Sequence, residues 1–219
     1  STLDRTGRSA CEIANRNLDF SMTLQQMPKP QSGPKRVTIL GSTGSIGCNT
    51  VELLAAGPKI YDVIALTANS NVALLAAQAR QLGARLAVIA DPERYGELKA
   101  ALSGTDIEVA AGKEALVDAA TRPADWVMAA IVGAAGLAPT LAAIRYGGIV
   151  GLANKECLVC AGDLMLAEIR KSGATLLPVD SEHNAIFQVL DVDHIEAVEK
   201  ITLTASGGPF RELSYKAMS

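Results

Sequence analysis

The stretch RVTILGSTGSIG, residues 36–47, decides the fold. Its aliphatic first half predicts a buried strand and its last residues predict the start of a helix, so Gly41, Gly44 and Gly47 fall in the turn between them. Glycines in such a turn allow the backbone to approach a pyrophosphate, whose charge is met by the N–H groups at the helix start. The spacing is GxxGxxG rather than GxGxxG, which leaves a glycine-rich turn without a ligand as the alternative. We expect a dinucleotide-binding turn here.

Short aliphatic runs alternate with alanine- and leucine-rich segments from Lys35 onward. This alternation is typical of βαβ units around a parallel sheet, and we predict an α/β fold with a Rossmann-like cofactor-binding domain. The expected strands are Arg36 to Leu40, Asp62 to Thr67, Leu86 to Ala90, Trp126 to Ala130, Ile149 to Ala153, Thr175 to Val179 and Lys200 to Thr204. The expected helices are Ser45 to Ala56, Val72 to Leu82, Pro92 to Ala101, Lys113 to Ala119, Leu137 to Arg145, Glu156 to Lys171 and Glu182 to Val189.

Changes in composition divide the chain into three parts. Residues 1–34 are polar and without clear periodicity, and we interpret them as a flexible leader or an expression remnant. Residues 35–153 carry the compact strand and helix repeats of a cofactor-binding domain. After a transition around 151–154, residues 154–219 bring polar strand ends, which predict the first part of an α/β catalytic domain.

The composition argues against several classes of function. A net charge of −3 and a pI of about 5.5 disfavour partners such as nucleic acid or an anionic membrane, and no apolar run reaches the roughly 18 residues that span a bilayer. The four cysteines form no disulfide framework, which favours a cytoplasmic location. Cys157 and Cys160 have CxxC spacing without a second ligand pair for zinc, and we interpret them as helix thiols. A small-molecule function is favoured.

The expected strand Asp62 to Thr67 ends in an uncharged loop. NAD-binding folds place an acid at this point for the ribose hydroxyls, and Asn69, Ser70 and Asn71 provide none. NADP is therefore favoured over NAD. No arginine or lysine lies in residues 67–71, so Ser70 and Asn71 would have to hold a 2′-phosphate with hydroxyl, amide and backbone donors.

Two further turns follow expected strands. MAAIVGAAGLAPT places Gly133 and Gly136 where the backbone either lies along the nicotinamide half of a dinucleotide or simply packs in a turn. LANKE places Asn154 just before a helix, which it is expected to cap. Lys155 adds a cation at a strand end, a position suited to holding an anion or polarising a carbonyl.

LPVDSEHNAIFQ, residues 177–188, combines a strand end with two acids. Asp180 and Glu182 stand two apart, so on an extended backbone their side chains point the same way, and two hard oxygen ligands suit Mg²⁺ or Mn²⁺. The alternative is that Asp180 or Ser181 caps a helix beginning near Glu182. His183 is interpreted as a local hydrogen-bonding residue.

ASGGPFRE, residues 205–212, again puts a glycine pair at a strand end. Ser206 and the backbone amides beside it either cradle a phosphate or form only a turn. Arg211 adds a positive charge close to them.

Taken together, GSTGSIG, MAAIVGAAGL, LANKE, PVDSEHNAIFQ and SGGPFR, in this order and at this spacing, closely resemble the 1-deoxy-D-xylulose 5-phosphate reductoisomerase family. The resemblance covers about residues 35 to 213. Members of this family are NADPH-dependent enzymes of the non-mevalonate isoprenoid pathway. The resemblance implies an NADPH domain, a catalytic domain with a divalent metal, a mobile loop over the substrate, a C-terminal helical domain and, for the full-length protein, a homodimer.

The resemblance also implies a reaction and its residues. Mg²⁺ or Mn²⁺ would bind the ketone and a hydroxyl of 1-deoxy-D-xylulose 5-phosphate as a Lewis acid while the carbon skeleton rearranges to an aldehyde, which NADPH reduces to 2-C-methyl-D-erythritol 4-phosphate. Carried over motif by motif, the NADPH contacts are Gly41, Thr43, Gly44, Ser45, Ile46, Asn69, Ser70, Asn71, Asn154 and Glu156; the substrate contacts are Lys155, Ser181, Glu182 and Ser206; the metal ligands are Asp180 and Glu182; and the catalytic residues are Lys155 and Glu182.

The sequence also departs from the family pattern. In the family, a third acidic metal ligand, a substrate lid and an Asn-Lys pair for the phosphate follow the SGGPFR segment, whereas this sequence ends at Ser219. We therefore expect this chain alone to lack part of the active site, and a non-catalytic NADP-binding fragment is the alternative function. A semialdehyde dehydrogenase is disfavoured, because its catalytic cysteine would follow a strand, while Cys157 and Cys160 fall inside an expected helix.

Overall fold

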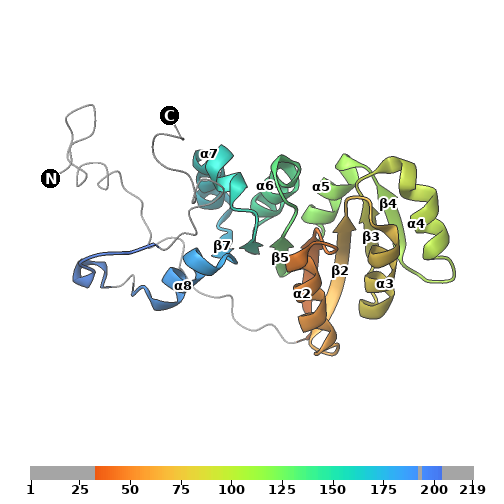
Figure 1. Cartoon of the computed structure of the whole chain (residues 1–219), viewed down its shortest axis with the longest axis horizontal. Helices are drawn as coiled ribbons and strands as arrows, with labels where there is room; N and C mark the ends of the chain where they lie inside the picture. Colours follow the sequence, from red (N-terminus) through yellow and green to blue (C-terminus); the bar gives the residue numbers. More distant parts are fainter. Residues whose placement is uncertain (1–32, 192–193, 204–219) are drawn as a thin grey trace, which may run out of the picture.

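The computed structural model describes residues 33–191 and 194–203, which form a parallel seven-stranded sheet with helices on both faces (Figure 1). The α/β fold predicted from the sequence is confirmed. Along the sheet the strand order is β4-β3-β2-β1-β5-β6-β7. The strands are β1 (Lys35–Leu40), β2 (Tyr61–Ala68), β3 (Leu86–Ile89), β4 (Glu108–Ala111), β5 (Trp126–Ala129), β6 (Ile149–Leu152) and β7 (Thr175–Pro178).

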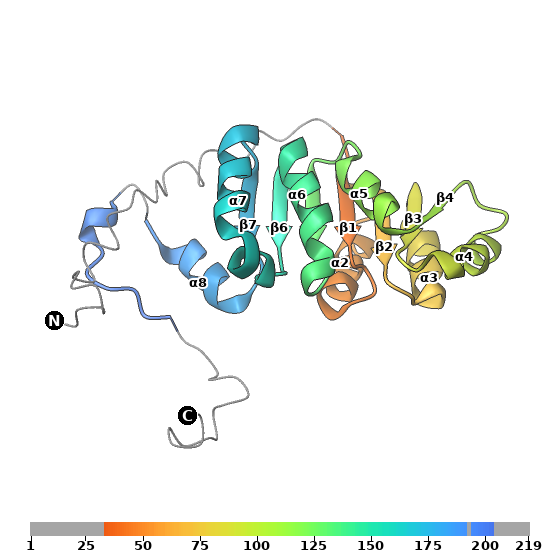
Figure 2. The ribbon, with the colours of Figure 1, turned by 90° about the horizontal axis from the view of Figure 1, so that it is seen from above.

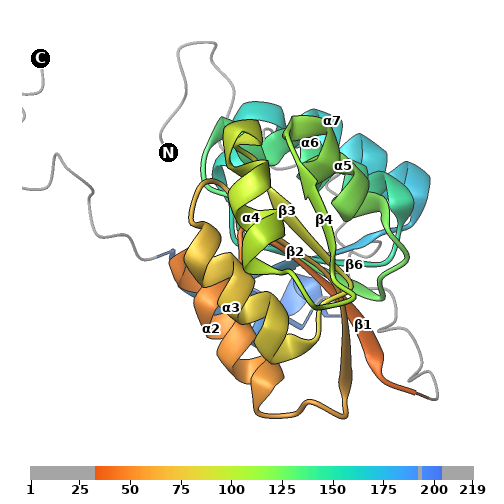
Figure 3. The same ribbon diagram turned by 90° about the vertical axis from the view of Figure 1, so that its right-hand side faces the viewer.

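The helices form two layers, one on each face of the sheet (Figure 3). One layer contains α2 (Ser45–Ala55), α3 (Val72–Leu82) and α4 (Tyr95–Ala101), and the other contains α5 (Lys113–Thr121), α6 (Leu137–Tyr146) and α7 (Glu156–Ser172). Short 3₁₀ turns are η2 (Pro92–Arg94), η3 (Ala134–Gly136) and η4 (Ile195–Ala197). A further helix, α8 (Ser181–Val189), extends beyond the β7 edge and has no buried residue (Figure 2). No helix in the described residues is long and apolar enough to cross a membrane.

The central strand β1 is buried on both faces, which explains its continuous apolar sequence. Val37 and Ile39 pack in the same core cluster as Leu75 of α3. Leu40, on the opposite face, belongs to the cluster that contains Ile144 of α6. All these side chains are fully buried, and burying each contributes about 1.5 to 3 kcal/mol. The two clusters make the sheet and its helix layers one unit.

The chain reverses direction along the sheet between β1 and β5. From β1 it moves outward through β2 and β3 to β4 (Figure 2), and then returns to form β5, which pairs with β1 on its other side. In open α/β sheets, ligands bind in the crevice at the carboxyl ends of the strands beside such a reversal. We therefore expect a ligand site at the turns that follow β1 and β5.

Most predicted elements are observed within one or two residues, and the differences have physical reasons. The helix expected over Pro92 to Ala101 divides into η2 and α4. Strand β4 was not predicted, because its sequence EVAA is short and lies half-exposed at the sheet edge, where no strong apolar pattern is needed. The strand predicted over Lys200 to Thr204 is wrong for its described residues 200–203, which are exposed and have no neighbouring strand to pair with.

The sheet continues beyond the domain transition expected around 151–154. Strand β7 pairs with β6 in parallel, from Ile149 with Thr175 to Leu152 with Pro178. Helix α7 contributes Met165 and Ile169 to the same core cluster as β6. The described part of residues 154–219 thus begins as a continuation of the sheet, and the division into cofactor and catalytic domains stays a prediction.

One ion pair joins the start of β1 to the residue before β5. The Arg36 guanidinium donates to both carboxylate oxygens of Asp125, with Nη2 at 2.5 Å from Oδ1 and Nε at 3.3 Å from Oδ2. The backbone N–H of Arg36 also donates to Asp125 Oδ2 at 2.9 Å. The side-chain hydrogen bond from Arg36 is the main reason that the pKa of Asp125 lies below its usual range.

We predict that Asp125→Asn lowers the free energy of unfolding at pH 7 by about 1 to 3 kcal/mol, because the charged hydrogen bonds are lost. The folded-state pKa of Asp125 is depressed, so the stabilisation is complete above the unfolded-state pKa of about 3.9 and disappears as the pH falls through the folded-state value. Urea titrations of both proteins at pH 7 and below pH 3 would test this.

Asp118→Asn is the matched control, because Asp118 is 63% exposed and Arg122 keeps its second partner, Glu108. Its effect should stay within about 0.5 kcal/mol. If the difference in the free energy of unfolding between wild type and Asp125→Asn did not change with pH, the role given to the ion pair would be contradicted.

Candidate functional site

Three strand ends meet at the carboxyl edge of the sheet. The backbone N–H of Gly41, just after β1, donates to Thr67 Oγ1 of β2 at 2.9 Å, and the N–H of Ser42 donates to the Thr67 carbonyl at 2.8 Å. Gly41 has a φ of +86°, and a Cβ atom there would lie 2.8 Å from the carbonyl oxygen of Ala130, which follows β5. The turn after β1 is therefore packed against the backbones of both neighbouring strands.

The other two glycines of this turn have different roles. A Cβ atom on Gly47 would lie 2.2 Å from the carbonyl oxygen of Gly41, so only glycine fits that position. Gly44, the N-cap of α2, is exposed, has φ −79° and ψ 172°, and would bring a Cβ atom only to 3.5 Å from Gly41 O. The fold requires Gly47 but not Gly44. Because Gly44 has no side chain and α2 has no side-chain cap, the start of this helix is open to an anion.

The remaining residues predicted to contact a cofactor at this turn lie around the same helix start. Thr43 is half-buried, while Ser45 and Ile46 are exposed in the first turn of α2. Asn69, Ser70 and Asn71, which the family resemblance implies as further NADPH contacts, are all exposed in the loop after β2.

The loop after β2 makes contacts that the sequence pattern did not indicate. Asn71 caps α3, because its Oδ1 accepts a hydrogen bond from the Leu74 N–H at 3.1 Å. The carbonyl of Ser70 accepts from Arg94 Nη1 at 2.9 Å. Arg94 lies 24 residues after Ser70, so the sequence of the loop itself gives no sign of this cation.

Asn154 does not cap the following helix, and that prediction is wrong. The N-cap of α7 is Lys155, which makes no side-chain cap hydrogen bond. Asn154 instead turns inward, 2% exposed, and its Nδ2 donates to the carbonyls of Ile131 at 2.6 Å and Gly133 at 2.9 Å. Its Oδ1 is buried without a protein partner among the described residues. The side-chain amide of Asn154 therefore donates to the loop after β5, and α7 begins without a side-chain cap.

The loop after β5 fits closely around this asparagine. A Cβ atom on Gly136 would lie 2.4 Å from the Ile131 carbonyl oxygen and 2.6 Å from Asn154 Nδ2. Gly136 therefore serves packing, one of the two alternatives left open by the sequence. Gly133 has a φ of +69° and open space around its Cβ position, so glycine is favoured there because it adopts this left-handed conformation without strain.

The acidic segment after β7 begins a helix rather than continuing a strand. Asp180 caps α8, because its Oδ1 accepts from the His183 N–H at 2.9 Å and contacts His183 Nδ1 at 2.7 Å. Ser181 and Glu182 are helical, so the argument that Asp180 and Glu182 share one side of an extended backbone is wrong. The capping alternative is confirmed for Asp180, and the local role expected of His183 is confirmed as well.

Asp180 remains a suitable cation ligand electrostatically. Burial alone would raise its pKa, but the hydrogen bonds from His183 and the charges of His183 and Lys155 outweigh burial and lower the pKa below its ordinary value. Lys155 and Glu156, after β6, are exposed, and of the two it is the charge of Lys155 that acts on Asp180. The backbone N–H of Val179 donates to the Leu152 carbonyl at 3.1 Å, which keeps the ends of β6 and β7 together.

The described residues contain no group of three His, Cys, Asp or Glu side chains arranged to hold a metal ion. The carboxylates of Asp180 and Glu182 have the hard oxygen chemistry that Mg²⁺ and Mn²⁺ prefer, and their assignment as ligands stays a prediction. Ser206 lies outside the described residues.

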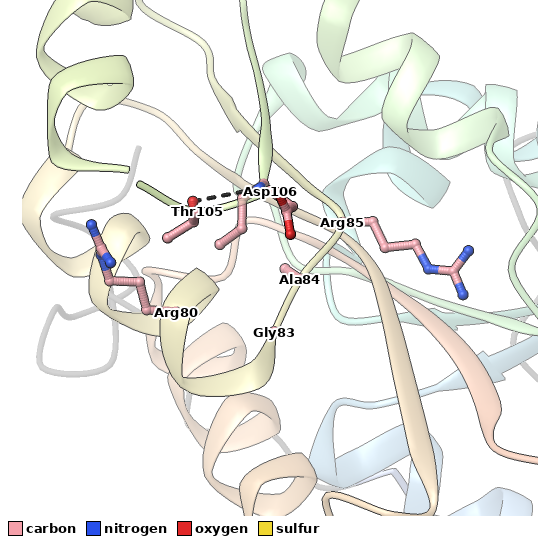
Figure 4. Close-up of a pocket in the computed structure, with 7 residues that line it drawn as sticks. Arg80, Gly83, Ala84, Arg85, Thr105 and Asp106 are labelled. Carbon is pink, nitrogen blue, oxygen red and sulfur yellow. Dashed lines mark hydrogen bonds between the residues drawn. The ribbon is translucent and has the colours of Figure 1, made fainter. Parts of the chain in front are cut away.

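A shallow pocket of about 460 Å³ lies away from this site, where α3 ends and β3 begins (Figure 4). Two arginines in its lining extend in opposite directions. Arg80 donates to the carbonyls of Ala101 and Ser103, and Arg85 pairs with Asp62. Because both guanidinium groups are engaged by the protein, the pocket does not compete with the carboxyl edge as a functional site.

The doubly wound sheet and the open glycine turn beside its chain reversal define the class of dinucleotide-binding α/β proteins. The sequence model of 1-deoxy-D-xylulose 5-phosphate reductoisomerase matches residues 37–162, and the model of the C-terminal domain of that enzyme matches residues 176–219. The chain therefore belongs to the 1-deoxy-D-xylulose 5-phosphate reductoisomerase family.

Individual relatives agree with this membership. A 1-deoxy-D-xylulose 5-phosphate reductoisomerase of Rhodospirillum centenum is 63% identical over 187 residues, which are 85% of this chain and 46% of the relative. The enzyme of Zymomonas mobilis, solved in complex with NADPH, is 57% identical with a TM-score of 0.80, over 84% of this chain and 49% of the other. A reductoisomerase in complex with NADPH, fosmidomycin and magnesium is 41% identical with a TM-score of 0.75, over 84% of this chain and 48% of the other.

We predict that the two glycines respond differently to substitution. Gly47→Ala should lower the free energy of unfolding by about 3 kcal/mol, because its methyl group overlaps backbone atoms. Gly44→Ser should leave it unchanged within about 0.5 kcal/mol or raise it, because serine is a good N-cap and has room there. Denaturant unfolding of both variants would decide, and equal losses of stability would refute the distinction.

Proposed function

We propose that this chain is the NADPH-binding part, and the first segment of the metal and substrate site, of an enzyme that converts 1-deoxy-D-xylulose 5-phosphate to 2-C-methyl-D-erythritol 4-phosphate. The chain spans about half the length of the curated relatives that it matches, 46% of the Rhodospirillum centenum protein. The observation that carries the proposal is the open helix start at Gly44, a glycine that the fold itself does not need. It lies where this fold class binds dinucleotides.

The NADPH site would extend along the carboxyl edge of the sheet. The N–H groups of Ser45 and Ile46 would meet the pyrophosphate, with Gly44 leaving room for it and with Gly41 and Thr43 forming the floor of the turn. The other proposed contacts are Asn69, Ser70 and Asn71 near the adenosine end, and Asn154 and Glu156 beside the loop after β5. Within the described part of the chain, the buried Oδ1 of Asn154 has no hydrogen-bond partner, which suits a polar ligand nearby.

The metal and substrate site would begin at the ends of β6 and β7. Asp180 and Glu182 would hold Mg²⁺ or Mn²⁺, and the surroundings that lower the pKa of Asp180 favour the ionised carboxylate that binds a cation. When bound, the metal supplies Lewis-acid polarisation of substrate oxygens. Lys155 would add positive charge close to the reacting oxygens, with Ser181 and Ser206 as further contacts for the sugar phosphate.

The enzyme that contains this chain is proposed to be a cytoplasmic homodimer. The alternative is that the 219-residue chain by itself binds NADP without catalysis. The proposed metal site has the carboxylates of Asp180 and Glu182, and the described residues contain no group of three side chains that could hold a metal ion. An assay of NADPH oxidation with 1-deoxy-D-xylulose 5-phosphate and Mn²⁺, run on this chain and on a version extended to the length of its relatives, separates the two. Turnover only in the extended version is expected; no turnover in either would overturn the proposed enzyme.

We predict that Gly44→Val raises the dissociation constant of NADPH at least about tenfold, equivalent to about 1.4 kcal/mol. The branched side chain would fill the space beside the α2 N-terminus that a pyrophosphate needs. Fluorescence titration with NADPH measures the effect, and Gly96→Ala, in open space on α4, is the control that should bind like wild type. If Gly44→Val bound NADPH with unchanged affinity, the turn after β1 would not be part of the cofactor site.

We predict that Glu182→Gln in the extended protein lowers metal-dependent turnover about hundredfold or more, because it keeps the side-chain shape but removes the ligand charge. The dissociation constant of NADPH should stay within about twofold, since the cofactor contacts lie elsewhere. Glu196→Gln, an exposed acid of η4, is the control. Wild-type turnover of Glu182→Gln at limiting Mn²⁺ would show that this acid is not a metal ligand.

A further inference from the structure

The turn after β3 lies directly beside the loop after β2. The N–H of Ala90 donates to the Ala68 carbonyl at 2.8 Å, and the N–H of Asp91 donates to the Asn69 carbonyl at 3.1 Å. Figure 2 shows β2 and β3 side by side, with α3 and α4 near them. The short helix η2, with Pro92 in its first turn, therefore begins at a fixed position next to Asn69.

Arg94 closes η2 and reaches back to that loop. Its Nη1 donates to the Ser70 carbonyl at 2.9 Å, and its side chain remains 43% exposed. One hydrogen bond uses one of the five N–H donors of a guanidinium, so most of the group is available to a ligand. The backbone carbonyl orients the guanidinium without neutralising its charge.

Two acids are close to Arg94, and both pair with it loosely. Asp91 Oδ2 lies 3.9 Å from Nε, and Glu97 Oε2 lies 3.4 Å from Nη1. Asp91 is also engaged as the cap of η2, where its Oδ1 accepts from the Glu93 N–H at 3.0 Å. Glu97 is 57% exposed, so its side chain can move into solvent when a stronger anion arrives.

The position of Arg94 corresponds to the ribose end of a dinucleotide. In this fold class the second strand ends at the adenosine ribose, where an acid binds the 2′-hydroxyl of NAD or a nearby arginine binds the 2′-phosphate of NADP. Residues 69–71 contain no acid. The same loop is joined to the phosphate turn through Thr67, which accepts hydrogen bonds from Gly41 and Ser42.

We propose that Arg94 is a cofactor-binding residue that recognises the 2′-phosphate of NADPH. Its planar fork can donate two parallel hydrogen bonds to a dianionic phosphate, which a ribose hydroxyl cannot match in strength. The inference rests on the proposed function, and it adds the residue that selects NADPH over NADH. It adds a cation to the uncharged groups of Ser70 and Asn71 that the sequence predicts to hold the phosphate.

Binding measurements on the 219-residue chain test the proposal without relying on turnover. Arg94→Met should raise the dissociation constant of NADPH about ten- to hundredfold while that of NADH changes less than about twofold. The fragment adenosine 2′,5′-bisphosphate should lose affinity in the same proportion, whereas 5′-AMP should not. Arg94→Lys should recover part of the loss, because a lysine keeps the charge but not the fork.

Two matched variants separate recognition from structure. Arg85→Met removes an arginine that pairs with Asp62 at the opposite end of β3, and it should leave both cofactor affinities unchanged. Glu97→Gln removes the competing carboxylate and should leave NADPH binding unchanged or tighter.

The outcomes distinguish the inference from the function on which it rests. If the wild-type chain binds NADPH and Arg94→Met does not weaken it, the inference fails and the proposed function stands. If Arg94→Met weakens NADPH and NADH equally, Arg94 only supports the loop, and the inference again fails. If the wild-type chain binds neither cofactor, both the inference and the proposed NADPH site fail.

Discussion

The structure depends on the close approach of backbones where β1 ends. Gly41, at φ +86°, lies against the Ala130 carbonyl on one side and bonds to Thr67 on the other, and Gly47 lies against Gly41. A side chain at either glycine would push α2 or the loop after β5 away from the sheet. These contacts therefore fix the chain reversal and the orientation of the helix start at Gly44.

The sequence predicted the sheet well because most strands are buried on both faces and show as uninterrupted aliphatic runs. The run at β1 is an example, since Val37 and Leu40 belong to core clusters on opposite faces. Strand β4 escaped prediction because an edge strand needs little apolar sequence. Residues 200–203 gave the opposite error, because alternating apolar residues do not form a strand without a partner.

The candidate site was predictable only where its residues are neighbours in sequence. The glycine turn and the cap at Asp180 are local, and the sequence contained both. Asn154 has the sequence of a helix cap, but its amide bonds to carbonyls 21 and 23 residues earlier, and that preference arises from burial in the folded chain. Arg94 reaches Ser70 only because β2 and β3 are adjacent. Contacts between strand ends cannot be deduced from local pattern.

Asn154 also links the two halves of the proposed site mechanically. Its buried amide holds the loop after β5, while the next residue, Lys155, lies close enough for its charge to affect Asp180. A ligand that displaced the loop at Ile131 to Gly133 would have to break these hydrogen bonds, and any movement of Asn154 would be transmitted to Lys155 through one peptide unit. Displacements of about 1 Å matter at reacting atoms. In the proposed enzyme, this connection at the end of β6 would hold the cofactor and the substrate at a fixed relative position.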